Sequence, residues 1–120
     1  MYKKVLLTTD GSPTASNAVK IGSSIARSLG SEILLLHVGE PATGKQVLES
    51  TSAGIEGDVQ MISVEGDAAD KILEVAEREN VDLIVVGNKG MTGARRFLLG
   101  SVPNQVSHNA HCSVFIAKTT

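Results

Sequence analysis

The stretch from Val81 to Val106 constrains the fold of this chain more than any other part of it. It opens with four consecutive aliphatic residues, Leu83 to Val86, a short apolar run that predicts a buried β-strand. Turn-forming and small residues follow the run: Gly87, Gly90, Gly93, Gly100 and Ser101. Because glycine has no Cβ, such a loop lets backbone N–H groups approach an anion, and a helix beginning near Ser101 would add unpaired N–H groups. The stretch therefore predicts a strand, an anion-binding loop and a helix N-terminus.

The remaining hydrophobic pattern predicts further strands that alternate with helices. The expected strands are Val5–Thr8, Glu32–Val38, Val59–Val64 and Ser113–Ala117. The expected helices run from Pro13 to Gly30, weakly over Lys45–Ala53, from Asp67 to Asn80, and over Ser101–Asn109. The strand at Val59–Val64 is the least apolar, which predicts a place towards an edge. Strand, helix and strand in this order form βαβ units, so the sheet should be parallel.

Residues typical of helix ends support three of these helices. Ser12 and Ser101 are expected N-caps, and Pro13 fits a first helical turn. Gly30 is an expected left-handed stop. Asp67 followed by Asp70 resembles a capping box. In the helix after Asp67, the residues expected to face inwards are Ala68, Ala69, Ile72, Leu73 and Ala76.

Composition narrows the class of protein. A chain of 120 residues predicts one domain, residues 1–120, with a single sheet-centred core. One Tyr, two Phe and no Trp argue against a base-stacking surface, and a net charge of −2 argues against general nucleic-acid binding. A single cysteine suits a reducing compartment. No apolar stretch is long enough for a signal peptide or a membrane span, so we expect a soluble cytoplasmic protein that binds neither nucleic acid nor membrane.

The spacing Gly87-x2-Gly90-x9-Gly100-Ser101 resembles the nucleotide-binding signature of the universal stress protein family, G-x2-G-x9-G-[ST]. The resemblance extends to LLTTDGSPTAS near the N-terminus, to LLLHV, and to FLLGSV before the last strand. It implies the ATP-binding subclass of that family. The site has neither the lysine and serine of a P-loop nor a dinucleotide fingerprint after the first strand.

The resemblance implies a doubly wound, five-stranded parallel α/β sheet of order 3-2-1-4-5 with helices on both faces, an adenine nucleotide α-hydrolase-like fold. In that order the winding reverses between strands one and four, and such folds bind ligands outside the carboxyl ends of those strands. Asp10 follows strand one and Gly87 ends strand four, so both should lie at this point.

The family's binding residues transfer to matching positions here. Adenine is expected near Thr8, Thr9 and Val38, and ribose near Asp10. Phosphates, with Mg²⁺ or Mn²⁺, are expected on the loop and at Ser101. The full expected nucleotide-binding set is Thr8, Thr9, Asp10, Val38, Val86, Gly87, Gly90, Gly100, Ser101 and Val102. Structural interpretations stay open: Asp10 as a turn residue, Val38 as core and Ser101 as a plain N-cap.

Other polar residues are interpreted as structural. Lys89, Arg95 and Arg96 are typical of a solvated face, with phosphate binding as the alternative. His108, His111 and Cys112 lack a further ligand cluster, so we do not expect a metal there. His37 is expected to be a satisfied core histidine or part of the pocket wall.

The predicted function is an ATP-binding universal stress protein, a homodimeric switch whose copies pair through Ser113 to Lys118. ADP or AMP could replace ATP. Alternatives are a slow ATP hydrolase, although no catalytic constellation is visible, and an interaction module without nucleotide.

The chain departs from the family in two places. His111 and Ser113 stand where many members have proline, and the segment between strands two and three is short, which could truncate the second helix.

Overall fold

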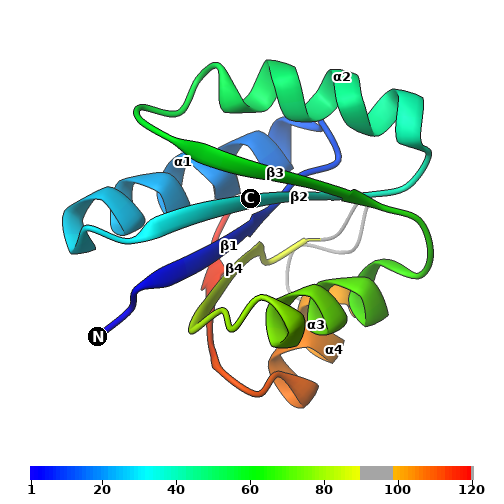
Figure 1. Ribbon diagram of the computed structural model, residues 1–120. Coiled ribbons are helices and arrows are strands. Elements are labelled where there is room, and N and C mark those ends of the chain that lie inside the picture. Colours follow the sequence, from blue (N-terminus) through cyan, green and yellow to red (C-terminus); the bar gives the residue numbers. More distant parts are fainter. Residues whose placement is uncertain (90–98, 120) are drawn as a thin grey trace.

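The computed structural model describes residues 1–89 and 99–119 of the chain. Strands and helices alternate along these residues (Figure 1). The strands are β1 (Lys4–Thr8), β2 (Glu32–Val38), β3 (Val59–Val64), β4 (Leu83–Gly87) and β5 (Ser113–Ala117). The helices are α1 (Pro13–Leu29), α2 (Pro41–Ser52), α3 (Ala68–Arg78) and α4 (Ser101–Asn109). Within the described part of the chain, no helix combines the length and apolar character needed to span a bilayer.

The strands form one parallel sheet of order β3-β2-β1-β4-β5, which confirms the predicted fold. β1 lies at the centre, between β2 and β4. β3 lies at one end of the sheet, as the weaker apolar pattern predicted, and β5 lies at the other. The chain winds from β1 towards β3 and then returns to add β4 and β5 on the far side of β1. The reversal therefore falls between β1 and β4.

Helices cover both faces of the sheet, with α1 and α2 on one face and α3 and α4 on the other (Figure 1). Successive residues of a strand point to opposite faces, so each strand contributes to two cores. In β2, Ile33 and Leu35 pack on the α1 and α2 side, and Leu34 and Leu36 pack on the α3 and α4 side. This explains why β2 is a continuous apolar run and not an alternating one.

Local signals fix the ends of α1. Ser12 is the N-cap, and its hydroxyl accepts a hydrogen bond from the Ala15 N–H at 3.2 Å. Gly30 ends the helix at a φ of 68°, a left-handed conformation that glycine adopts without steric cost. Both predicted caps are confirmed. In α3 the carboxylate of Asp67 accepts the Asp70 N–H at 3.1 Å, which is one half of a capping box.

The predictions were wrong at two points of helix geometry. α2 begins at Pro41, before the predicted start at Lys45, because Glu40 is the N-cap and Pro41 occupies the first turn. Val75, left out of the inward face of α3, is fully buried in the core against the sheet.

Candidate functional site

A cleft opens where the winding of the sheet reverses, at the carboxyl ends of β1 and β4. We call it the switch-point cleft. Its enclosed cavity volume is about 60 Å³, and the wider space of about 580 Å³ around it includes open solvent. Its walls come from β1, β2, β4, α1, α3 and α4, so it depends on the whole sheet. Its lining residues are Thr8, Thr9, Asp10, Ser12, Thr14, Ala15, Ala18, Leu36, Val38, Ala68, Ile72, Val86, Gly87, Lys89, Val102 and Pro103.

Seven of the ten predicted binding residues line this cleft. They are Thr8, Thr9, Asp10, Val38, Val86, Gly87 and Val102. Gly100 and Ser101 lie beside it, at the start of α4, and do not line it. Gly90 lies outside the described residues, as do Arg95 and Arg96. The structure therefore brings together the two segments, after β1 and at the end of β4, that the sequence placed at one point.

Asp10 forms the turn that leads from β1 into α1. One oxygen of its carboxylate accepts the Ser12 N–H at 2.9 Å. Thr9 supports the same turn, because its hydroxyl oxygen accepts the Gly11 N–H at 3.1 Å. Gly11 has a φ of 85°, where a side chain would be strained. Asp10 thus shapes the turn, as the structural interpretation predicted, and also lines the cleft, while its contact with a ligand stays a prediction.

The floor and one wall of the cleft are apolar. Leu36 and Val38 come from β2, Val86 comes from β4, and Ile72 comes from α3. Val38 packs against the core, as one interpretation predicted, and also lines the cleft, while its contact with a base stays a prediction. Thr9 lies beside this wall, because its backbone N–H donates to the Leu36 oxygen at 3.0 Å. A flat apolar ring packed on such a wall would be removed from water, which favours binding. The hydroxyl groups of Thr8 and Thr9 would be available to polar atoms at the edge of the ring.

Asn88 ties three parts of the chain together next to the cleft. Its backbone N–H donates to the Ala117 oxygen at 2.8 Å, and its backbone oxygen accepts the Gly100 N–H at 2.9 Å. Its side-chain oxygen accepts the Thr119 N–H at 2.7 Å and the Thr119 hydroxyl at 3.1 Å. The sequence analysis missed this residue. The only signal was its position between the first two glycines of the motif, where a side chain able to bond to backbone has a structural use.

Lys89 corrects the interpretation of the loop cations as a solvated face. It is only 8% exposed and lines the cleft between the end of β4 and the start of α4. A charged group this buried needs compensation from neighbouring polar groups or from a bound anion. Lys89, which follows β4, therefore contributes a buried cationic side chain to the lining of the cleft.

The N-terminus of α4 differs from the prediction. Gly100 is the N-cap and makes no side-chain cap, whereas Ser101, predicted as the cap, is the first helical residue and is exposed. The Gly100 N–H is used by the Asn88 oxygen, and Pro103 has no N–H. The donors that this first turn can offer to an anion are therefore the backbone N–H groups of Ser101 and Val102.

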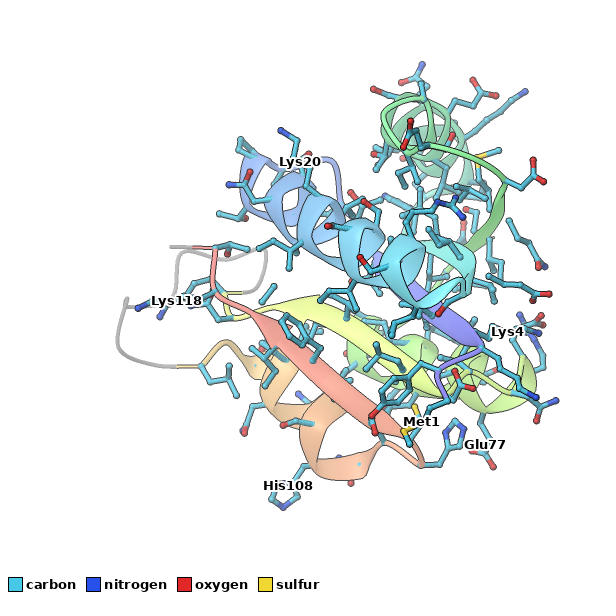
Figure 2. The ribbon with its side chains drawn as sticks, turned by 90° about the vertical axis from the view of Figure 1, so that its left-hand side faces the viewer. Met1, Lys4, Lys20, Glu77, His108 and Lys118 are labelled. Atoms are coloured by element: carbon cyan, nitrogen blue, oxygen red, sulfur yellow. The ribbon has the colours of Figure 1, made fainter. Side chains whose placement is uncertain are left out.

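Histidines and the cysteine lie outside the switch-point cleft. His37 is buried on the other face of β2, below α2, and its Nδ1 has no hydrogen-bond partner among the described residues. It is a core histidine, but not a satisfied one. His108 points away from the body of the protein (Figure 2) and His111 is exposed. Burial, helped by the negative charge of Asp82, raises the pKa of the Cys112 thiol. No metal-binding group of three His, Cys, Asp or Glu residues occurs within the described ranges.

The sheet order and the position of the cleft place the chain in the class of doubly wound α/β proteins that bind ligands at a switch point. The sequence model of the universal stress protein family matches residues 1–57 and 44–118. The chain belongs to the universal stress protein family. The two matched ranges overlap at residues 44–57, in the segment between β2 and β3 that we expected to be short for the family.

Two curated relatives illustrate the similarity. Universal stress protein MJ0531 of Methanocaldococcus jannaschii is 36% identical over 141 aligned positions, which include 98% of this chain and 83% of the relative. Universal stress protein YxiE of Bacillus subtilis is 28% identical, with 98% of this chain and 100% of the relative covered. The 141 aligned positions exceed the 120 residues of the chain, so MJ0531 carries residues with no counterpart here.

Solved structures show the same fold. A universal stress protein in complex with cAMP matches with a TM-score of 0.85 at 31% identity, covering 99% of this chain and 98% of that chain. MJ0577, a protein whose biochemical function was assigned from its structure, matches with a TM-score of 0.77 at 30% identity, covering 100% and 98%. Both support the adenine nucleotide α-hydrolase-like fold.

Proposed function

We propose that this chain binds an adenine nucleotide in the switch-point cleft and acts as a nucleotide-dependent homodimeric switch. The observation that carries the proposal is the composition of the cleft: an apolar wall from β2, hydroxyls and a carboxylate after β1, and a buried cation after β4. These groups suit a base, a sugar and a phosphate respectively. The related protein solved with cAMP, at 31% identity over nearly the whole chain, supports an adenine nucleotide as the ligand.

The polarity of the cleft orients the ligand. The base packs on Val38 and Leu36, and Thr8 and Thr9 supply hydroxyl groups at its edge. Asp10 accepts hydrogen bonds from the ribose hydroxyls with the carboxylate oxygen not used by Ser12. The phosphates then point towards Lys89 and the N–H groups of Ser101 and Val102, where a positive charge and a helix N-terminus favour negative charge.

A divalent cation fits this site only together with the phosphates. The described cleft residues offer one carboxylate, Asp10, and a few hydroxyls, too few for a cation held by protein alone. Mg²⁺ commonly takes one or two protein ligands and completes its shell with phosphate oxygens and water. We expect Mg²⁺ or Mn²⁺ to enter with the nucleotide and the Ser101 hydroxyl to lie near it.

The proposed dimer forms through β5 and the residues that follow it, Ser113 to Lys118. β5 is an outermost strand of the sheet and lies at the front of Figure 2. Phe115 is 40% exposed on it, and the strand carries no charged residue that would oppose pairing.

A switch requires a ligand that favours one state of the protein, so the nucleotide must change this interface or the surface near the cleft. A cytoplasmic location would supply the nucleotide.

The first experiment identifies the ligand of the purified protein. Protein prepared without added nucleotide is denatured, and the released small molecules are identified by mass spectrometry. Recovery of about one ATP, ADP or AMP per chain supports the proposal. Protein that is empty, and that fails to bind ATP with Mg²⁺ in calorimetry, overturns it and favours an interaction module.

Variants then locate the site. Asp10→Ala should weaken ATP binding at least tenfold, because it removes the ribose acceptor. Asp10→Asn keeps an oxygen that can accept the Ser12 N–H, so the turn is retained, but it replaces the other carboxylate oxygen, the proposed ribose acceptor, with an amide nitrogen. A loss of affinity in this variant therefore reports on the ribose contact and not on the turn. Asp58→Ala, at an exposed acidic residue outside the cleft, is the matched control. Equal affinity in all four proteins would refute this site.

The alternative of slow hydrolysis is tested separately. ATP is incubated with the protein for a long time, and the products are analysed for ADP or AMP.

A further inference from the structure

The outer edge of β3 exposes unpaired backbone. β3 is the last strand of the sheet on its side, and no strand of the described residues pairs with its outer edge. The Val64 oxygen accepts the Gly39 N–H at 2.8 Å, so the backbone of Val64 points towards β2. The direction alternates along a strand, so Gln60 and Ile62 also point inwards. The N–H and C=O groups of Val59, Met61 and Ser63 therefore point away from the sheet.

This edge lacks the features that normally prevent a second strand from pairing. Natural edge strands are usually protected by Lys, Pro, a bulge or great shortness. β3 has six residues, VQMISV, with no charge and no proline. Met61 is 47% exposed, which places a large apolar side chain at the same edge. The strand thus offers backbone donors, backbone acceptors and apolar surface together.

A groove beside the strand supplies specificity. It lies between α2 and β3, and its apolar lining residues are Pro41, Leu48, Met61 and Val64. Lys45 and Glu49 of α2 also line it, one helical turn apart on the same side of the helix. Glu65, just after β3, is a further acidic residue of the groove, so a strand that paired with β3 would lie next to one positive and two negative charges.

We propose that β3 pairs antiparallel with β3 of a second copy of this chain, so that the sheet continues across a two-fold axis. A strand edge is satisfied only by another extended strand, and a second copy carries the same edge. The two-fold axis places the α2 helices of both copies side by side with opposite directions. Lys45 of one copy then faces the Glu49 region of the other, so two pairs of opposite charge, related by the axis, form between the helices.

This contact is distinct from the dimer proposed through β5. The strand order puts β3 and β5 at opposite ends of the sheet, so both contacts can form at once. Two different self-pairing edges on one chain lead to assemblies larger than a dimer. Nucleotide binding in the switch-point cleft is not required for this pairing, and failure of one proposal leaves the other untouched.

The test begins with the β5 contact blocked. Phe115 is substantially exposed, so Phe115→Lys should fold and remove only the β5 contact. The mass of this variant is measured by analytical ultracentrifugation over a wide range of concentration, with circular dichroism as the check on folding. We expect a dimer at high concentration. Adding Met61→Lys to the same background should give a monomer, because a lysine at the edge opposes pairing. A Phe115→Lys protein that stays monomeric at all concentrations would overturn the proposal.

Reversing the charges of Lys45 and Glu49 tests whether a loss of dimer comes from the contact between copies or from damage to the fold. Lys45→Glu should raise the dimer dissociation constant about tenfold, because acidic residues then face each other. Lys45→Glu combined with Glu49→Lys restores opposite charges across the axis and should recover the affinity. Recovery in the double variant supports the proposal, and a double variant weaker than either single one contradicts it.

Amide exchange reports on the edge directly. In the dimer the outward N–H groups of Met61 and Ser63 should become protected from hydrogen exchange as concentration rises. The N–H groups of Ile62 and Val64, which point towards β2, should be protected at every concentration. Protection that does not change with concentration at Met61 and Ser63 would count against pairing at this edge.

Discussion

The carboxylate of Asp82, just before β4, accepts a hydrogen bond of 2.9 Å from the backbone N–H of Lys4 at the start of β1. Its second oxygen accepts the Lys3 N–H at 3.0 Å. The Asp82 N–H in turn donates to the Lys4 oxygen at 3.1 Å. One side chain therefore fixes the entry of β4 against the entry of β1. Those two strands later diverge to form the switch-point cleft, so this contact sets their alignment from the opposite end.

Replacing Asp82 should destabilise the protein in a pH-dependent way. Burial acts to raise the pKa of the Asp82 carboxyl, but the backbone hydrogen bonds from Lys4 and Lys3 outweigh it and lower the pKa below its ordinary value. The folded state therefore favours the charged form, and this stabilisation is complete above the unfolded pKa of about 3.9. It is lost as the pH falls through the lower folded value.

We expect Asp82→Asn to unfold about 1 kcal/mol more easily than the native protein at neutral pH. Urea denaturation at a series of pH values measures the difference. The gap between the two proteins should close in acid, below the folded pKa, where the native carboxyl is also neutral. A gap that stays constant down to the most acid pH would contradict this assignment.

A side chain at Gly22 should be costly because α1 lies very close to the sheet there. A Cβ built on Gly22 would lie 2.4 Å from Leu7 Cδ2 and 3.0 Å from Val85 Cγ1. Gly22→Ala should therefore lower the free energy of unfolding by about 1–3 kcal/mol, as overpacking in a dense core does. Gly54→Ala is the control, because its Cβ would meet only the Thr51 oxygen at 3.6 Å. Equal stability of the two variants in thermal unfolding would disprove the close packing.

Removing the side chain of Asn88 should loosen the end of β4. Asn88→Ala loses the acceptor for the Thr119 N–H and hydroxyl, at a cost of about 1 kcal/mol. Thr119→Ala removes only the hydroxyl and should cost less, since the backbone N–H remains. Hydrogen exchange at the Thr119 amide measures the effect directly. Unchanged exchange in Asn88→Ala would mean that this hydrogen bond does not hold the C-terminal residues.

Lys89 should contribute to phosphate binding and not to base binding. Lys89→Gln removes the buried positive charge and should weaken ATP, ADP and AMP by about tenfold, with little change for adenosine. Calorimetry with this series measures the difference. Lys20→Gln, at an exposed cation on α1 (Figure 2), is the control for net charge. An equal loss of affinity for adenosine and for AMP would place Lys89 away from the phosphates.

Much of the fold could be predicted because its signals act over short distances. Ser12 and Gly30 delimit α1 through hydrogen bonds and dihedral angles within a few residues, and aliphatic runs such as Leu83 to Val86 identify buried strands directly. The helix after β2 was harder. Gly44 is buried there against His37 and Ser63, so a residue that weakens a helix in isolation is required by the packing.

The candidate site also has features that local sequence patterns predicted and features that depend on packing between distant segments. The glycine spacing and the position of Asp10 after a strand predicted two segments that the sheet does bring together, because parallel strands that flank a reversal end at one edge. The burial of Lys89, the bonds of Asn88 to Thr119 and the N-cap at Gly100 depend on contacts between β4, β5 and α4. Those contacts join residues distant in the chain, so no local pattern encodes them.

The sequence by itself determined the succession of strands and helices along the chain, the two caps of α1 and the family, since each follows from neighbouring residues or from a linear motif. Only the tertiary structure decided which polar groups are enclosed. Lys89 is buried against the cleft, although the loop around it was interpreted as a solvated face, and His37, expected in the core, has no hydrogen-bond partner for its Nδ1 among the described residues. The burial of a side chain depends on which distant segments pack against it. The hydrophobic effect that drives this packing depends on the apolar area buried and not on the separation of the residues in the sequence.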